Sequence, residues 1–195
     1  MYQLGITGGI GSGKTLVCSI FEKLGIPVYY ADSEARTLMN SDPELVRGIV
    51  GLFGKEAFNG DSLNREFLAK TVFGDSDMLT KLNDLVHPAV RKDFSLWVEI
   101  QTDAPYVVEE AAILFESGAA RYLDGSVLVY APEAMRIRRV MQRDGVDEES
   151  VRRRMIHQMD ETDKMKLADH IIYNDETELL LPQIIALHKK ILTSR

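Results

Sequence analysis

The chain has a single cysteine among its 195 residues, and Cys18 cannot form an internal disulfide on its own. Cysteine usage therefore gives no sign of an oxidising compartment, and we interpret Cys18 as a small core residue. No uncharged apolar run approaches the ~18 residues of a membrane span. The N-terminus reads as a strand rather than as a basic and then apolar leader, so we expect no membrane partner and a cytoplasmic location.

Positive charge is also in deficit, because 23 Lys and Arg residues face 30 Asp and Glu residues and the formal net charge is −7. Nucleic-acid binders need a basic face that displaces counterions from phosphate. We therefore expect no nucleic-acid partner and a small charged ligand instead. The four histidines show no metal-ligand spacing, and with one cysteine the sequence predicts no zinc site.

Internal repeats, low-complexity tracts and Gly/Ser-rich linkers are absent too. With 45% hydrophobic and 27% charged residues, the composition is that of an ordinary globular protein. We expect one α/β domain that carries insertions. The hydrophobic helix faces fit either a core or an interface, so the sequence leaves the oligomeric state open.

Residues 8–15 contain the most informative motif, Gly-Gly-Ile-Gly-Ser-Gly-Lys-Thr, which fits G-x-x-x-x-G-K-[ST] and follows an apolar strand-like stretch. Its glycines allow a tight turn whose N–H groups point at a polyphosphate, and the following helix offers its positive N-terminal end. Lys14 would reach the β- and γ-phosphates, and Thr15 would place its hydroxyl on Mg²⁺. The motif predicts a Mg-nucleotide site; a Gly-rich turn without a ligand is the alternative.

Strand-like and helix-like segments alternate along the chain, as in βαβ units. This pattern predicts an α/β fold, a three-layer sandwich around a mostly parallel five-stranded sheet. The expected strands are 2–7, 26–30, 106–109, 126–131 and 170–174. Between the second and third strands we find no convincing strand, and we interpret this region as a helical insertion. Its helical stretches include 44–53, 65–73 and 79–85.

Acidic residues stand at the ends of two expected strands, where ligands of open α/β sheets bind. Asp32 is a candidate general base; alternatively, Asp32 or Ser33 caps the next helix. Glu110 follows Glu109 at the end of the third strand and is a candidate carboxylate for Mg²⁺, or else a solvated strand end. Glu116 is either a substrate contact or a surface or capping residue.

Seven of the 13 arginines lie within residues 136–154, a local reversal of the acidic charge. Most of them are interpreted as a solvated helical surface paired with Glu148 and Glu149. Arg143, before the expected turn at 144–145, is singled out to stabilise a transferring phosphoryl group. His87 precedes Pro88, where we expect a helix to end, and taken alone it reads as a structural hydrogen bonder.

Taken together, these motifs resemble the dephospho-coenzyme A kinase family, in order and over nearly the whole chain. The matching segments are Thr7 to Lys14, Ala31-Asp32, Phe53-Gly54, Leu63-Asn64-Arg65, His87-Pro88, Leu114-Phe115-Glu116, Arg143-Asp144, Gln158, Ala168-Asp169 and Asn174. The resemblance implies ATP-dependent phosphorylation of the ribose 3′-hydroxyl of dephospho-coenzyme A, with Mg²⁺ as cofactor.

The resemblance also implies a division of the chain and a set of site residues. A nucleotide-binding core spans 1–31, 103–138 and 159–195, a coenzyme A-binding insertion spans 32–102, and a lid spans 139–158. Asp32, Lys14 and Arg143 are the implied catalytic residues. The implied nucleotide contacts are Gly9, Gly11, Ser12, Gly13, Lys14, Thr15, Leu16 and Asn174. The implied substrate contacts are Asp32, Arg65, His87 and Glu116, and the metal contacts are Thr15 and Glu110.

The chain departs from the family pattern at four places. Tyr30 stands where the family usually has a first aspartate, and Leu16 stands where it has a second hydroxyl residue. Ala112 replaces a proline before Leu114-Phe115-Glu116, and residues 175–176 are Asp-Glu where a glycine is usual.

Three competing interpretations share the phosphate loop. A shikimate or nucleoside-monophosphate kinase would differ in the acceptor pocket, and residues 63–116 disfavour it. A GTP-dependent switch lacks its Asn-Lys-x-Asp motif here. A non-catalytic ATP-binding regulator would need no base at Asp32.

Overall fold

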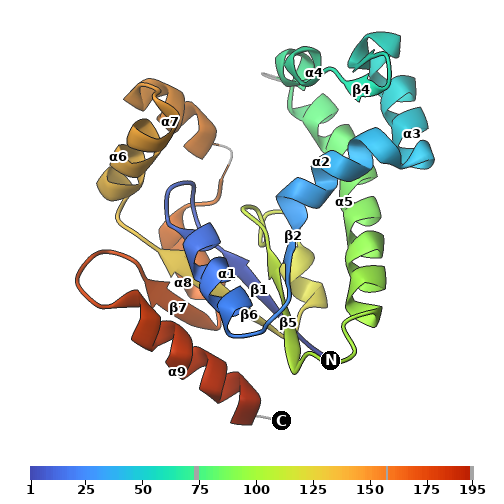
Figure 1. Cartoon of the computed structure of the whole chain (residues 1–195). Helices are drawn as coiled ribbons and strands as arrows, with labels where there is room; N and C mark the ends of the chain where they lie inside the picture. Colours follow the sequence, from blue (N-terminus) through green and yellow to red (C-terminus); the bar gives the residue numbers. More distant parts are fainter. Residues whose placement is uncertain (73–74, 157, 194–195) are drawn as a thin grey trace. The chain divides into compact units, whose positions relative to one another are not determined.

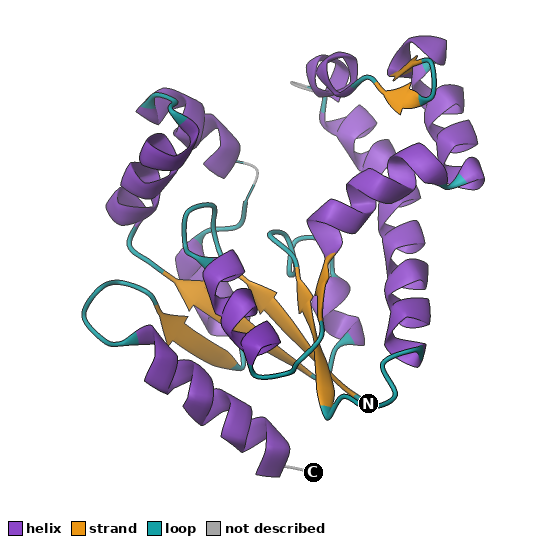
Figure 2. Cartoon of the chain, in the orientation of Figure 1, coloured by secondary structure: helices purple, strands orange, loops and turns teal. Residues whose placement is uncertain are grey.

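The computed structural model describes residues 1–72, 75–156 and 158–193, which divide into two compact units (Figure 1). Residues 1–30 and the described residues from 101 onward form one unit, here called the sheet unit. Residues 31–100 supply the other, here called the helical unit, and Figure 2 shows that helices dominate it. Within the described parts of the chain, no helix combines the length and apolar character needed to cross a membrane.

The sheet unit is built on five parallel strands in the order β2-β5-β1-β6-β7, which confirms the predicted fold class. The strands are β1 (Tyr2–Thr7), β2 (Val28–Tyr30), β5 (Tyr106–Glu110), β6 (Gly125–Tyr130) and β7 (His170–Tyr173). β2 begins two residues later than expected, because Pro27 has no N–H to donate to a neighbouring strand.

Helices α1 (Lys14–Lys23) and α9 (Leu180–Thr193) pack with one face of this sheet in a single apolar core. Cys18 is fully buried there, as predicted, and burial raises the pKa of its thiol above the ordinary value. Leu114 and Leu123 lie over Gly5 on the opposite face, where a Cβ would come within 2.6 Å of both. α8 (Glu161–Leu167) packs against β6, and a 3₁₀ turn spans Ala119–Tyr122.

Two further helices, α6 (Glu133–Asp144) and α7 (Glu148–Met155), pack on each other through Ile137, Val140 and Val151. Gly145, with φ 67°, ends α6 in the left-handed conformation and allows the turn. The expected lid, 139–158, begins inside α6 rather than at a helix boundary, and its residue 157 lies outside the described residues.

The helical unit contains α2 (Ala31–Ser41), α3 (Pro43–Phe53), α4 (Arg65–Val72) and α5 (Ser76–Glu99), with a 3₁₀ turn at Lys55–Ala57. Asp42 caps α3 by accepting hydrogen bonds from the N–H groups of Glu44 and Leu45. Phe73, the expected end of α4, lies outside the described residues.

Two expectations about this unit were wrong. β3 (Phe58–Asn59) pairs with β4 (Ser62–Leu63) in a hairpin whose two-residue strands are too short to show alternation in the sequence. α5 also continues past Pro88 instead of ending there. Pro88 is exposed and removes only one backbone donor, whereas the helix buries Val86, Val90 and Phe94 along one face.

Candidate active site

The phosphate loop connects the end of β1 to the first turn of α1. Gly11 (φ 81°) and Gly13 (φ 97°) adopt the left-handed conformation that other residues rarely reach. A side chain on Gly13 would also collide with the amide of Asn174, and one on Gly11 with the backbone carbonyl of Arg136. The neighbouring elements therefore enclose the outer side of the loop closely.

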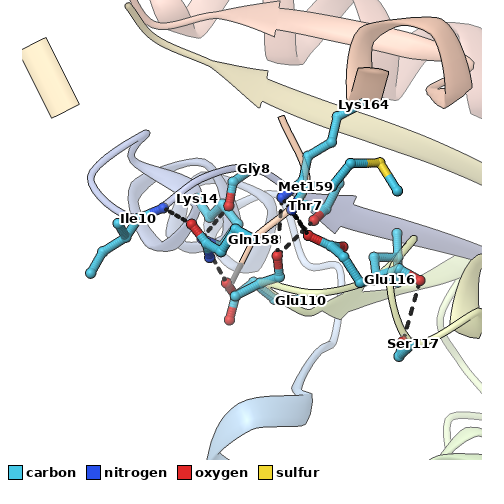
Figure 3. Close-up of polar contacts among 12 residues, drawn as sticks. Thr7, Gly8, Ile10, Lys14, Glu110, Glu116, Ser117, Gln158, Met159 and Lys164 are labelled. Atoms are coloured by element: carbon cyan, nitrogen blue, oxygen red, sulfur yellow. Dashed lines mark hydrogen bonds and ion pairs between the residues drawn. The ribbon is translucent and has the colours of Figure 1, made fainter. Parts of the chain in front are cut away.

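Lys14 and Glu110 meet beside this loop (Figure 3). The Lys14 ammonium donates to the Gly8 carbonyl at 2.9 Å and lies 3.9 Å from a Glu110 carboxylate oxygen. β1 and β5 are adjacent and in register at Ile6 and Glu110, which brings the strand end to the loop. A cation and a carboxylate are thus held, nearly buried, where the motif predicts polyphosphate.

Thr15 and Leu16 lie exposed in the first turn of α1, the position predicted for nucleotide contact. The oxygen donors near the loop, the Thr15 hydroxyl and the Glu110 carboxylate, fit Mg²⁺, which prefers oxygen ligands and retains several from water or phosphate. No cluster of three or more His, Cys, Asp or Glu side chains suited to a metal occurs among the described residues.

Glu109 lies next to Glu110 but faces the other side of the sheet, because successive strand residues alternate. Only 5% of it is exposed, and burial raises its pKa to about 7. The sequence does not distinguish the two glutamates, since the difference arises from what covers each face.

Tyr30 is the last residue of β2, and the Glu22 carboxylate of α1 acts on its hydroxyl. Burial, followed by the charged groups nearby, raises the pKa of Tyr30 above its ordinary value. An aspartate at this position would face Glu22 and Glu110. The tyrosine thus fits an already acidic environment.

The helical unit carries three predicted site residues. Asp32 lies exposed in the first turn of α2, which starts at Ala31, so Asp32 and Ser33 lie inside the helix and not at its cap position. Arg65 is exposed at the first position of α4. His87 is half-buried in α5, where burial and then the Arg91 charge lower its pKa.

Asn174 follows β7 and binds the phosphate loop from outside. Its side-chain amide donates to the Ser12 carbonyl at 2.7 Å, and its backbone N–H donates to the Tyr130 carbonyl. Its own carbonyl accepts from the Arg139 guanidinium at 3.0 Å. A contact with adenine remains a prediction for this residue.

The clustered arginines behave mostly as expected. Arg152 pairs with Glu148 at 2.8 Å and Arg153 with Glu149 at 2.7 Å, both at the surface. Arg136 differs: it is 5% exposed, and its Nε donates to the Ala131 carbonyl. Its place in the first turn of α6, against the phosphate loop, explains the burial, which composition alone does not reveal.

Arg143 is exposed and forks onto the carboxylate of Asp144, with N–O distances of 2.7 and 3.2 Å. Arg154 binds the same carboxylate at 2.7 Å. The two guanidiniums hold the pKa of Asp144 at about 2. Both guanidiniums are thus engaged with Asp144 in this structure.

A parallel sheet with this loop, a lysine and a carboxylate at the strand ends defines the class of phosphate-loop nucleotide-binding proteins. The sequence model of one family in this class, dephospho-CoA kinase, matches residues 2–179. The chain belongs to the dephospho-CoA kinase family.

Two curated relatives carry the name of this family, and a solved structure shares the fold. The dephospho-CoA kinase of Salinibacter ruber is 44% identical over 180 residues, covering 91% of this chain and 90% of the relative. The dephospho-CoA kinase of Porphyromonas gingivalis is 39% identical, and the match covers 100% of this chain and 96% of that relative. The crystal structure of TT1252 from Thermus thermophilus is 35% identical, with a TM-score of 0.84 over 99% of this chain and 97% of that one.

Members of this family phosphorylate dephospho-CoA to CoA in the last step of CoA biosynthesis, so the chain is a kinase. This decides against the shikimate, nucleoside-monophosphate and regulator interpretations. The fold alone does not distinguish these interpretations, because proteins with the same fold can act on different substrates.

Proposed function

We propose that this chain transfers the terminal phosphoryl group of ATP to the ribose 3′-hydroxyl of dephospho-CoA and releases ADP. The observation that carries the proposal is Lys14, which is bonded to Gly8 and stands 3.9 Å from Glu110 beside the phosphate loop. The nucleotide is bound by the loop and by the residues around it. These contacts are Gly9, Gly11, Ser12, Gly13, Lys14, Thr15, Leu16 and Asn174.

Asp32 accepts the proton of the attacking hydroxyl in this mechanism, as its exposed position directly after β2 and Ala31 allows. Lys14 and Arg143 stabilise the charge that spreads over the transferring phosphoryl oxygens. Arg143 exchanges Asp144 for those oxygens, and its planar fork suits either partner.

Thr15 and Glu110 would hold Mg²⁺, because hydroxyl and carboxylate oxygens are the donors that this ion prefers. When bound, Mg²⁺ neutralises charge on the phosphate oxygens. Lys14 then orients the phosphates, and the loop N–H groups hold them in line with the acceptor.

We assign dephospho-CoA binding to the insertion, residues 32–102, with Asp32, Arg65 and His87 as contacts. Residues 139–158 form the lid, and the segments 1–31, 103–138 and 159–195 form the nucleotide-binding core. Glu116, also predicted as a substrate contact, is engaged with Met159 and Lys164. The cytoplasm remains a prediction from the sequence.

The acceptor is tested by incubating purified protein with Mg-ATP and dephospho-CoA, AMP, shikimate or no acceptor. We expect ADP, and a product one phosphate heavier, only with dephospho-CoA. Transfer to another acceptor would overturn the substrate, and ATP binding without transfer to any acceptor would overturn the kinase activity.

Asp32→Asn tests the base. Removing it is expected to lower kcat by about 10² to 10⁴ with little change in ATP affinity. Glu34→Gln is the matched control, because Glu34 is the other acidic residue in the first turn of α2. Unchanged turnover in the Asp32 variant, or an equal loss in the control, would reject the assignment.

A further inference from the structure

Lys164 of α8 is a fully buried ammonium that the proposed chemistry does not use. It lies 3.1 Å from a carboxylate oxygen of Glu116 and 3.4 Å from the Ala112 carbonyl. A buried charge costs several kcal/mol unless it is well paired. The pair therefore fixes α8 to the segment that follows β5.

Glu161, one turn earlier on α8, is a second buried charge, only 9% exposed. No donor among the described residues meets full hydrogen-bond geometry with either carboxylate oxygen, but the Gly9 N–H lies close enough to the carboxylate to lower its pKa. Burial raises its pKa, while the charges of Arg136 and Lys164 oppose that shift. The carboxylate stands against the phosphate loop, since a Cβ built on Gly9 would lie 2.8 Å from it.

Arg136 of α6 contacts the same point of the loop. Its guanidinium would collide with any side chain at Gly9. Its Nε is fixed by the Ala131 carbonyl at 3.1 Å, so the side chain cannot move away without losing that bond. Gly9 is thus enclosed by a buried cation and a buried anion.

These residues form a series of alternating charges that we call the charge brace. Its members are Glu116, Lys164, Glu161 and Arg136.

The charge brace reaches the loop a second time, through the segment between α7 and α8. Glu116 accepts the Met159 N–H at 2.8 Å, and the neighbouring Gln158 accepts the Ile10 N–H at 2.9 Å (Figure 3). Glu116 is therefore linked to the Ile10 N–H through the adjacent residues Met159 and Gln158. Gly9 and Ile10 are both supported from outside the loop.

We propose that the charge brace positions the phosphate loop, holding Gly9 and Ile10 so that the loop N–H groups are oriented before the nucleotide binds. Glu116 is in this view a positioning residue and not a substrate contact. A loop with three glycines at positive φ has little rigidity of its own, so its order comes from these neighbours. The inference rests on the proposed use of the loop for Mg-ATP.

The main test is the double variant Glu116→Gln/Lys164→Met, which removes both charges at similar volume and leaves neither unpaired. We expect the Kd and KM for Mg-ATP to rise about tenfold, the equivalent of one net hydrogen bond. The KM for dephospho-CoA should stay within about twofold. Asp163→Asn/Lys166→Met is the matched control, because it removes an exposed ion pair from the same helix.

A lower Tm with unchanged ATP affinity would mean that the charge brace only stabilises the fold, and would overturn the proposal. If the double variant does not fold, Glu116→Gln alone decides, because its amide oxygen can still accept the Met159 N–H. We expect it to raise the KM for ATP. A rise in the KM for dephospho-CoA alone would instead make Glu116 a substrate contact. Absence of phosphoryl transfer by the unmodified protein would overturn the proposed function. The Kd for ATP is measured without transfer, so it tests the charge brace separately.

Discussion

At the scale of single residues, neighbours in the sequence have different chemistry in the fold. Glu110 faces Lys14 and the phosphate loop, whereas Glu109 is buried on the other face without a charged partner acting on its pKa. The phosphate-loop residues could be predicted one by one, because the motif itself specifies their conformation. Lys164, Glu161 and Arg136 could not, because no spacing in the sequence shows that α6 and α8 meet at Gly9.

Glu109 makes the stability of the protein depend on pH. Its pKa is 4.5 in the unfolded chain and about 7 in the folded chain. Between these two pH values the folded chain keeps a proton on Glu109 that the unfolded chain has lost. The contribution of Glu109 therefore favours the folded state most below about pH 4.5, and it falls by about 3 kcal/mol as the pH rises to about 7. Glu109→Gln should remove that loss. Thermal unfolding between about pH 5 and pH 8 measures it.

The control for this measurement is Glu178→Gln, since Glu178 is exposed in the same unit. We expect the Tm of the Glu109 variant to fall less with rising pH than the Tm of both the control and the unmodified protein. Parallel curves for all three proteins would show that Glu109 is not the titrating group.

At the scale of elements, long patterns were predicted well and short ones poorly. All five strands of the sheet were found within two residues of each end, because buried parallel strands are continuous apolar runs. The end of α5 was predicted wrongly, because the tendency of Pro88 to end a helix is weaker than the stabilisation gained by burying one face of this 24-residue helix. The hairpin at 58–63 leaves too few residues for any periodic signal.

Pro88→Ala tests how α5 tolerates its proline. Alanine restores the N–H that the Asp84 carbonyl lacks and has a far higher helix propensity. Because residue 88 is exposed, no packing is lost, and we expect the free energy of unfolding to rise by about 1 to 3 kcal/mol. Urea titration measures it, with Ser95→Ala on the same helix as control. No gain beyond the control would mean that the helix has already compensated for the missing bond.

At the scale of the whole molecule, the chain divides into two compact units, and each unit carries some of the proposed site residues. Lys14, Thr15 and Glu110 belong to the sheet unit, whereas Asp32 and Arg65 belong to the helical unit. The sequence predicts the helical insertion from a long interval without convincing strands, although the β3–β4 hairpin lies within that interval. The substrates should therefore protect different parts of the chain.

Hydrogen exchange tests this division. A non-hydrolysable ATP analogue with Mg²⁺ should slow exchange in the phosphate loop and the first turn of α1, and dephospho-CoA should slow it in α2, α4 and α5. Ligand binding to one unit raises its opening free energy, by about 2.7 kcal/mol at a hundredfold excess over Kd. Protection of the sheet unit alone by dephospho-CoA would contradict the assignment of residues 32–102.

Cys18, buried between α1 and the sheet, gives the protein an internal reporter of its own opening. A thiol reacts as the thiolate and only where reagent can reach it, and burial denies Cys18 both conditions in the folded sheet unit. Because the chain carries no other thiol, the rate of maleimide labelling follows how often this unit opens. Nucleotide should slow that labelling in proportion to its occupancy, so that ligand affinity can be followed on unmodified protein without a label in the site.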